Sequence, residues 1–314
     1  MAGFQQLRVT RKVDFRGATK LGVGDPLTRG KVLYVDSASW GVGASGRDGT
    51  DPNYPLDKID SAVNLCTAGD NDYIFVLNSY DNDATTITMD IASVHVIGLG
   101  SINLAAPYCW LKIAGTGAAA CFTLQGSNSA NVEIAGFAMA ADASHACITT
   151  KTGASTELVY AWIHHNGFAA SGDAAFLAQD GILEADGTGL DGTLVEDNLF
   201  GWQIARDGIR FVDFYWGCIR KNIFRGLTGG VAIDQITGGH SSGMPDILDN
   251  KCFQQAATVE GAFITTTDAG GGLIDGNVCA EDATGTCGNN PYLEGTGANA
   301  WGVNWKGYAV TLPA

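Results

Sequence analysis

The sequence predicts an all-β protein, a solenoid of the right-handed parallel β-helix type, and three observations lead to that prediction. Glycine is abundant, at 43 of 314 residues, about twice its usual share of roughly 7%. Charged residues make up only 16% of the chain, and the Lys and Glu that favour long helices are scarce. A short motif also recurs through the second half of the sequence. Many short strands joined by turns rich in Gly, Asn, Asp and Ser have this character.

The first 30 residues show neither a helical nor a strand period and are predicted to form an extended arm. They hold six basic and two acidic residues, a net charge of +4, so the rest of the chain carries −19. The arm has no continuous apolar core and is not expected to be a secretory signal. The acidic body is expected to repel nucleic acid and anionic membranes, whereas the arm favours an acidic surface. The alternative is a solvated tail with a chance charge bias.

The solenoid is expected to occupy residues 31–290, with a first strand at 31–36. In 55–66 the apolar residues fall at helical spacing, and Pro55 suits the first turn of a helix. This segment predicts one short amphipathic helix that covers the open N-terminal end of the solenoid. Three β-rich runs follow, at 73–77, 94–99 and 132–137. Residues 291–314 are expected to cover the other end or to pack between subunits.

The repeated motif reads aliphatic-x-x-Asn-x-Phe or Cys, and it occurs five times. Its Asn residues stand at intervals of 32, 24, 28 and 27 residues, and they are Asn166, Asn198, Asn222, Asn250 and Asn277. One repeat cannot bury its own apolar side, so each is expected to form a coil that stacks on the next at about 4.8 Å. Asn tolerates unusual backbone angles at a bend and can bond backbone groups of the neighbouring coil. A structural ladder of Asn side chains is therefore predicted.

The eight cysteines contain no C-x-x-C motif, which argues against a zinc knuckle or a redox pair. Reduced, buried thiols are the expectation for them. Cys252 and Cys279 take the motif position that Phe holds in the three earlier repeats. Both are therefore predicted to be core residues.

Several segments of the chain resemble the pectate-lyase-like β-helix superfamily. They are Leu33–Asp36, Gly46–Thr50, Pro55–Cys66, Gly69–Tyr80 and Asp90–Gly100. The sequence of Gly69–Tyr80, GDNDYIFVLNSY, looks like the start of the first full coil in that family. The resemblance covers 31–290 at the level of pattern and implies the fold, because this scaffold hosts many activities. The chain looks most like the β-helix proteins carried on tailed bacteriophage particles, which implies a homotrimer.

Enzymes on this scaffold that cleave glycans use clustered carboxylates, and inverting hydrolysis needs two carboxyls about 6.5–9.5 Å apart. The candidate acids lie between the coils and are Asp180, Glu184, Asp207, Asp213 and Asp234. Asp207 and Arg210 are expected to face one groove together. Asp-Gly pairs are, however, ordinary turn chemistry. The sequence also lacks the paired-Asp, Gly-His-Gly and Arg-x-Lys signatures of polygalacturonases, so we predict no catalytic residue.

No metal site and no cofactor are predicted. The segment 186–191, DGTGLD, is similar to a calcium-binding nonapeptide motif that works in tandem copies, and it occurs once. A paired His can ligate a metal, but His164 and His165 have no third ligand at a useful spacing. Neighbours along a strand also point to opposite faces. Surface or packing roles are therefore expected for both histidines.

Two functions remain as expectations. The first is a capsid decoration or cement protein on the exterior of a virion, a homotrimer that binds the major capsid protein through its arm. The binding residues would be Arg8, Arg11, Lys12, Arg16 and Lys20. The second is a tailspike-type protein that binds or cleaves host polysaccharide. The scattered tryptophans suit a weak glycan-binding platform or subunit contacts.

Overall fold

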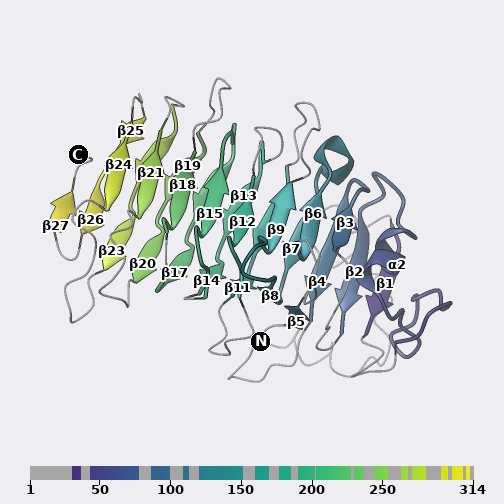
Figure 1. The fold of residues 1–314 in the computed structure, drawn as a ribbon. Helices are drawn as coiled ribbons and strands as arrows, with labels where there is room; N and C mark the ends of the chain where they lie inside the picture. Colours follow the sequence, from purple (N-terminus) through teal and green to yellow (C-terminus); the bar gives the residue numbers. More distant parts are fainter. Residues whose placement is uncertain are drawn as a thin grey trace, which may run out of the picture.

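The chain forms a parallel β-solenoid with almost no helix (Figure 1). The computed structural model describes residues 30–36, 43–77, 86–99, 109–112, 120–150, 160–169, 177–184, 190–201, 203–227, 230–236, 244–253, 263–267, 271–280, 291–295, 299–306 and 309–311. Three sheets run along the solenoid, and the neighbouring strands within each sheet come from successive coils. The prediction of an all-β parallel β-helix is confirmed.

The strands of each sheet follow one another in space as follows. The ten-stranded sheet contains β1 (Val32–Val35), β2 (Asp72–Val76), β4 (Val94–Gly98), β7 (Glu133–Ala135), β10 (Trp162–His164), β13 (Leu194–Glu196), β16 (Cys218–Arg220), β19 (Asp246–Leu248), β22 (Leu273–Asp275) and β25 (Ala300–Trp301). The nine-stranded sheet contains β27 (Ala309–Thr311), β26 (Asn304–Lys306), β23 (Val278–Ala280), β20 (Lys251–Phe253), β17 (Ile223–Arg225), β14 (Leu199–Phe200), β11 (Gly167–Phe168), β8 (Phe137–Ala140) and β5 (Cys109–Lys112). The eight-stranded sheet contains β24 (Tyr292–Glu294), β21 (Ile264–Thr266), β18 (Ile233–Gln235), β15 (Ile209–Phe211), β12 (Ile182–Leu183), β9 (Ile148–Thr150), β6 (Phe122–Leu124) and β3 (Ile87–Met89).

The α-helix of the described chain, α2, spans Ile59–Val63 and is shorter than the predicted 55–66. A 3-10 helix, η1, spans Gly126–Ser129. Pro55 precedes the first residue of α2 by four positions. After Val63 the helix tightens into turns in which Leu65 N donates to Ala62 O and Cys66 N donates to Val63 O. The buried face of α2 packs beside β1 and β2, at the N-terminal end of the solenoid (Figure 1). No helix in the described part of the chain is long and apolar enough to cross a membrane.

Of the two terminal segments predicted from the sequence, the structure describes parts of the C-terminal one but not the N-terminal arm before residue 30. Residues 1–29 lie outside the described residues, and with them all five basic residues predicted to bind a capsid. Beyond residue 290, β24, β25 and β26 each join one of the three sheets, so this segment continues the solenoid. β27 then pairs antiparallel with β26, unlike the parallel pairs elsewhere among the described strands.

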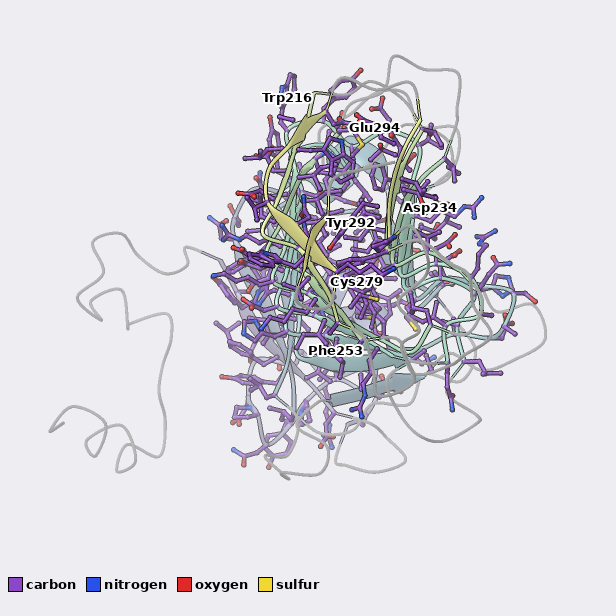
Figure 2. The ribbon with its side chains drawn as sticks, turned by 90° about the vertical axis from the view of Figure 1, so that its left-hand side faces the viewer. Trp216, Asp234, Phe253, Cys279, Tyr292 and Glu294 are labelled. Atoms are coloured by element: carbon purple, nitrogen blue, oxygen red, sulfur yellow. The ribbon has the colours of Figure 1, made fainter. Side chains whose placement is uncertain are left out.

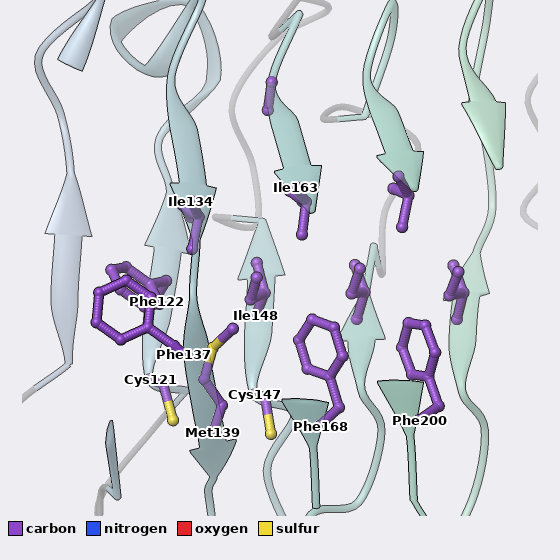
Figure 3. Packing of buried hydrophobic residues seen from close by; sticks show 14 of the residues in the cluster. Cys121, Phe122, Ile134, Phe137, Met139, Cys147, Ile148, Ile163, Phe168 and Phe200 are labelled. Carbon is purple, nitrogen blue, oxygen red and sulfur yellow. The ribbon is translucent and has the colours of Figure 1, made fainter. Parts of the chain in front are cut away.

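The core is built by stacking like residues on like residues. In the ten-stranded sheet Ile134, Ile163 and Val195 are partners in register, and all are fully buried. In the nine-stranded sheet Phe168 and Phe200 stack with their ring centroids 4.6 Å apart and their planes nearly parallel (Figure 3). Such columns form because each coil places the same motif position at the same point of the cross-section. Figure 2, seen along the solenoid, shows the inside of this core between the sheets.

Cys252 and Cys279 continue the column of Phe side chains, because Phe224 pairs with Cys252 and Cys252 with Cys279. They are 7% and 1% exposed, as expected for core residues. Burial raises the pKa of the Cys252 thiol to about 12, which leaves it unreactive. Cys279 is disulfide-bonded. The expectation of reduced thiols throughout is therefore wrong for this residue.

Candidate functional site

The structure brings the five predicted Asn residues into one buried ladder. At each step the backbone N–H and the side-chain Nδ2 of one Asn donate to Oδ1 of the Asn in the next coil, at 2.9–3.2 Å. Nδ2 also donates to a carbonyl oxygen of the preceding coil, as Asn222 does to Val195 O at 2.9 Å. All of these groups are internal to the fold, so the ladder stabilises the turn and leaves little for a ligand to bind.

Asn304 is a sixth member of this ladder that the motif did not find. Its Oδ1 accepts from the backbone and side chain of Asn277, and its Nδ2 donates to Ile274 O. Trp305 and Lys306 follow it, whereas the motif requires Phe or Cys two positions after Asn. The interval of 27 residues from Asn277 is the signal that could have found it.

The residue before each of the five motif Asn residues has a left-handed backbone. His165, Asp197, Lys221 and Asp249 have φ between 52° and 55°, and Gly276 has φ 70°. The strand therefore ends abruptly at this point, and the side chain of the turn residue leaves the alternation of the strand. Non-glycine residues are tolerated here because the Asn side chains of two coils fix the turn around them.

Two of the candidate acids, Asp180 and Asp207, hold the backbone of the next coil. Asp180 Oδ1 accepts from Asp207 N at 3.1 Å, and Asp207 Oδ1 accepts from Val231 N at 2.8 Å. Arg206 donates to both carboxyl oxygens of Asp180, and Arg210 donates to Asp207 Oδ2 at 2.8 Å. Asp207 and Arg210 do lie together, as expected. Their contacts are those of a structural ladder with balanced charge.

The carboxyl group of Glu184 has a similar role on the same side of the solenoid. The side chain is fully buried, and its Oε2 accepts from Val212 N at 2.7 Å and from Asp213 N at 3.1 Å. Asp213 is itself 7% exposed. Residues 186–189 of the DGTGLD segment lie outside the described residues, and Asp191 at its end accepts from Tyr215 N at 2.7 Å.

The carboxyl group of Asp234 has a raised pKa. Burial, followed by the negative charge of Asp207, raises the pKa of Asp234 to about 6. The nearest cation is Arg210, whose Nη1 lies 3.8 Å from Asp234 Oδ2. Figure 2 shows Asp234 on the outside of the eight-stranded sheet. Asp180 and Asp207 are thus buried and bonded to the backbone, whereas Asp234 lies on the outer surface of the eight-stranded sheet.

A second cluster lies on the outer face of the ten-stranded sheet. The outer row, as we name it, consists of Tyr73, His95, Glu133, Trp162, His164, Glu196 and Arg220. His95 Nδ1 and His164 Nε2 each lie 2.8 Å from a different oxygen of Glu133, and His95 stacks on Tyr73. Burial alone would raise the pKa of Glu133, but the hydrogen bonds from His164 and His95 lower it to about 2. This carboxyl is therefore ionised at neutral pH.

The outer row continues across the next two coils. Trp162 stacks on His164 with ring centroids 3.9 Å apart, and its Nε1 donates to Glu196 Oε1 at 2.9 Å. Arg220 Nε donates to the other oxygen of Glu196 at 2.7 Å. From β2 to β16 the row crosses five strand intervals, about 24 Å. Sequence reasoning missed it because its members come from six strands, and only the register of the sheet brings them together.

The two adjacent histidines are a further correction. His164 ends β10, and His165 follows with φ 53°, so the two imidazoles meet on one side of the chain. Their Nδ1 atoms are 2.7 Å apart, and the rings lie edge to face. The expectation of opposite faces is wrong here because it holds only for extended backbone. No group of three or more His, Cys, Asp or Glu side chains suited to a metal occurs among the described residues.

The fold and these clusters define a parallel β-helix protein. No protein-family model, no curated protein and no solved structure matches the chain.

Proposed function

We propose that this chain is a structural protein of a virus particle, a capsid decoration protein attached through its basic N-terminal arm. The observation that supports the proposal is the role of the candidate acids. Asp180, Asp207 and Glu184 are bonded to backbone amides of the neighbouring coil. Three of the five candidate carboxylates thus serve the solenoid, and a rod of stacked coils is suited to a structural role.

The distribution of charge supports the same proposal. The arm carries +4 and the rest of the chain −19. A basic segment joined to an acidic, rigid body can bind an acidic shell while the body stays clear of it. We further propose that the chain is related to the pectate-lyase-like proteins of tailed phages and forms homotrimers. Three arms on one trimer would gain avidity on a symmetric capsid.

The test is co-sedimentation of the purified chain with undecorated capsids of the virus that encodes it. We expect the full-length chain to sediment with capsids and a version without residues 1–30 to stay in solution. Replacing Arg8, Arg11, Lys12 and Arg16 by Glu should also abolish attachment. The circular dichroism of the solenoid should not change, because the arm lies before β1.

The matched control reverses charge on the body instead. Lys58, Lys221 and Lys251 are exposed on the solenoid, and replacing all three by Glu should leave attachment intact. Normal attachment of the arm variant would contradict the role of the arm. If neither the full-length chain nor the truncated version sediments, the decoration role itself is wrong.

The outer row favours a second candidate, a protein that binds host polysaccharide. Trp162 is 41% exposed, and its ring is held in place by His164 and Glu196. A fixed aromatic ring with nearby polar groups is typical of a ligand-binding surface. The capsid experiment separates the two candidates, because polysaccharide binding at this row needs neither a capsid nor the arm.

A further inference from the structure

The meeting point of His164 and His165 has a chemistry that neither proposed function uses. The Nδ1 atoms of the two rings face each other at 2.7 Å. Neutral imidazole has one N–H and one lone pair, so the position of each hydrogen decides what this contact is. The surrounding hydrogen bonds fix that position.

Glu133 determines the tautomer of His164. The Glu133 carboxyl group lies between two imidazole rings, with Oε1 2.8 Å from His164 Nε2 and Oε2 2.8 Å from His95 Nδ1, so both of its oxygens are placed to accept and His164 Nε2 carries the hydrogen. In the neutral ring Nδ1 of His164 then holds a lone pair directed at His165. Two lone pairs repel at this distance, so in the metal-free chain His165 Nδ1 carries a hydrogen and donates it to His164 Nδ1. A cation that replaces this hydrogen would be held by both lone pairs.

We propose that His164 and His165 bind a divalent transition metal ion of the Cu²⁺ and Zn²⁺ class through their two Nδ1 atoms, with Glu133 orienting the His164 ring. Imidazole nitrogens suit these ions. A ligating His commonly donates its other N–H to a carboxylate, as His164 does here. Water completes the coordination, since the pair supplies two ligands.

The geometry needs only a small adjustment. Bonds of about 2.0–2.1 Å in a tetrahedral site place two nitrogens about 3.3 Å apart, so the rings must separate by about 0.6 Å. His165 is exposed and lies in a turn, so its ring can rotate without disturbing the core. His164 is held by Glu133 on one side and by stacking on Trp162. One ligand is therefore fixed and the other adapts.

The local charge favours a cation at this point. Glu133 lies directly behind His164, and Asp197 is exposed in the equivalent turn position of the next coil, about 4.8 Å away. Arg220 is the nearby cation of the outer row, and it is bonded to Glu196. The proposal stands apart from capsid attachment, since it uses the solenoid alone.

The test is calorimetric titration of the full-length, untagged chain with CuCl₂ and with ZnCl₂, after treatment with a chelator. We expect one equivalent of Cu²⁺ per chain, with nitrogen superhyperfine splitting from two imidazoles in the electron paramagnetic resonance spectrum. His165→Asn should weaken binding at least tenfold, and Asn tolerates the left-handed turn. Glu133→Gln should weaken it roughly 10- to 100-fold by loosening His164.

His145 provides the matched control, because it is another accessible histidine with a carboxylate partner, Asp142, at 2.7 Å. His145→Ala should leave the affinity unchanged. Circular dichroism of each variant checks that the solenoid is intact. Binding by His165→Asn at wild-type affinity would overturn the proposal. So would an equal loss in His145→Ala, since the metal would then bind histidines without regard to the pair.

Discussion

Asn222 connects three coils through one side chain. Its Nδ2 donates to Val195 O and Asn250 Oδ1, and its Oδ1 accepts from the backbone and side chain of Asn198. Asn222→Ala leaves buried donors and an acceptor without partners, so we expect the free energy of unfolding to fall by about 1–3 kcal/mol. Urea denaturation measures it. Asn53→Ala, at an exposed turn, is the control, and an equal effect from both would argue against the ladder.

Asp234 gives a prediction that depends on pH. Its pKa is raised from 3.8 to about 6, so ionisation opposes folding. The contribution of Asp234 to the free energy of unfolding is therefore greatest below pH 3.8, where the group is protonated in both states. This contribution is lost as the pH rises through 6. Asp234→Asn should therefore stabilise the chain at pH 8 by about 1–2 kcal/mol after solvent screening, and should give no gain at pH 3.5.

Urea denaturation at the two pH values measures this difference. Asp70→Asn, at an exposed carboxyl, is the matched control and should change stability little at either pH. A gain from Asp234→Asn that is the same at both pH values would mean that ionisation of Asp234 does not oppose folding.

At the scale of the strand, large and small residues alternate between neighbouring sheets. A Cβ atom added to Gly208 would lie 2.6 Å from the ring of Phe224, one coil later. Gly181 stands in the same relation to Phe200. Two coils after Gly208, Phe263 occupies the position that Gly208 holds beside the eight-stranded sheet. Cys279 occupies the position that Phe224 holds in the nine-stranded sheet two coils earlier. The aromatic ring, which packs on Phe224, therefore now comes from the eight-stranded sheet. The cross-section thus keeps its volume while the bulky side chain changes sheet.

Gly208→Ala tests this fit. The added methyl meets the Phe224 ring and the carbonyl oxygen of Ala232, and we expect a loss of about 1–3 kcal/mol in the free energy of unfolding. Combining it with Phe224→Leu should cost less than the sum of the two single changes, since the smaller side chain makes room. Additive losses in a double-mutant cycle would place the strain on the backbone contact with Ala232 instead.

At the scale of the whole molecule, sequence and structure agree where the pattern repeats. The motif predicts the coils, the stacked Asn residues and the core position of Cys252, because each coil meets the same surroundings. It does not predict the outer row, since partners on that face depend on register rather than on spacing along the chain. It also fails at His165, where a left-handed residue ends the alternation of the strand.

The left-handed turn has a consequence for how this molecule can diversify. The Asn side chain makes the hydrogen bonds that hold the turn, so the side chain of the preceding residue is not needed for them. The preceding residue therefore differs from coil to coil: His165, Asp197, Lys221, Asp249 and Gly276. The first four of these residues have exposed side chains, which follow one another along the solenoid at about 4.8 Å per coil, and Gly276 has no side chain. Natural selection or protein design can therefore change the side chains along this edge one coil at a time without changing the fold.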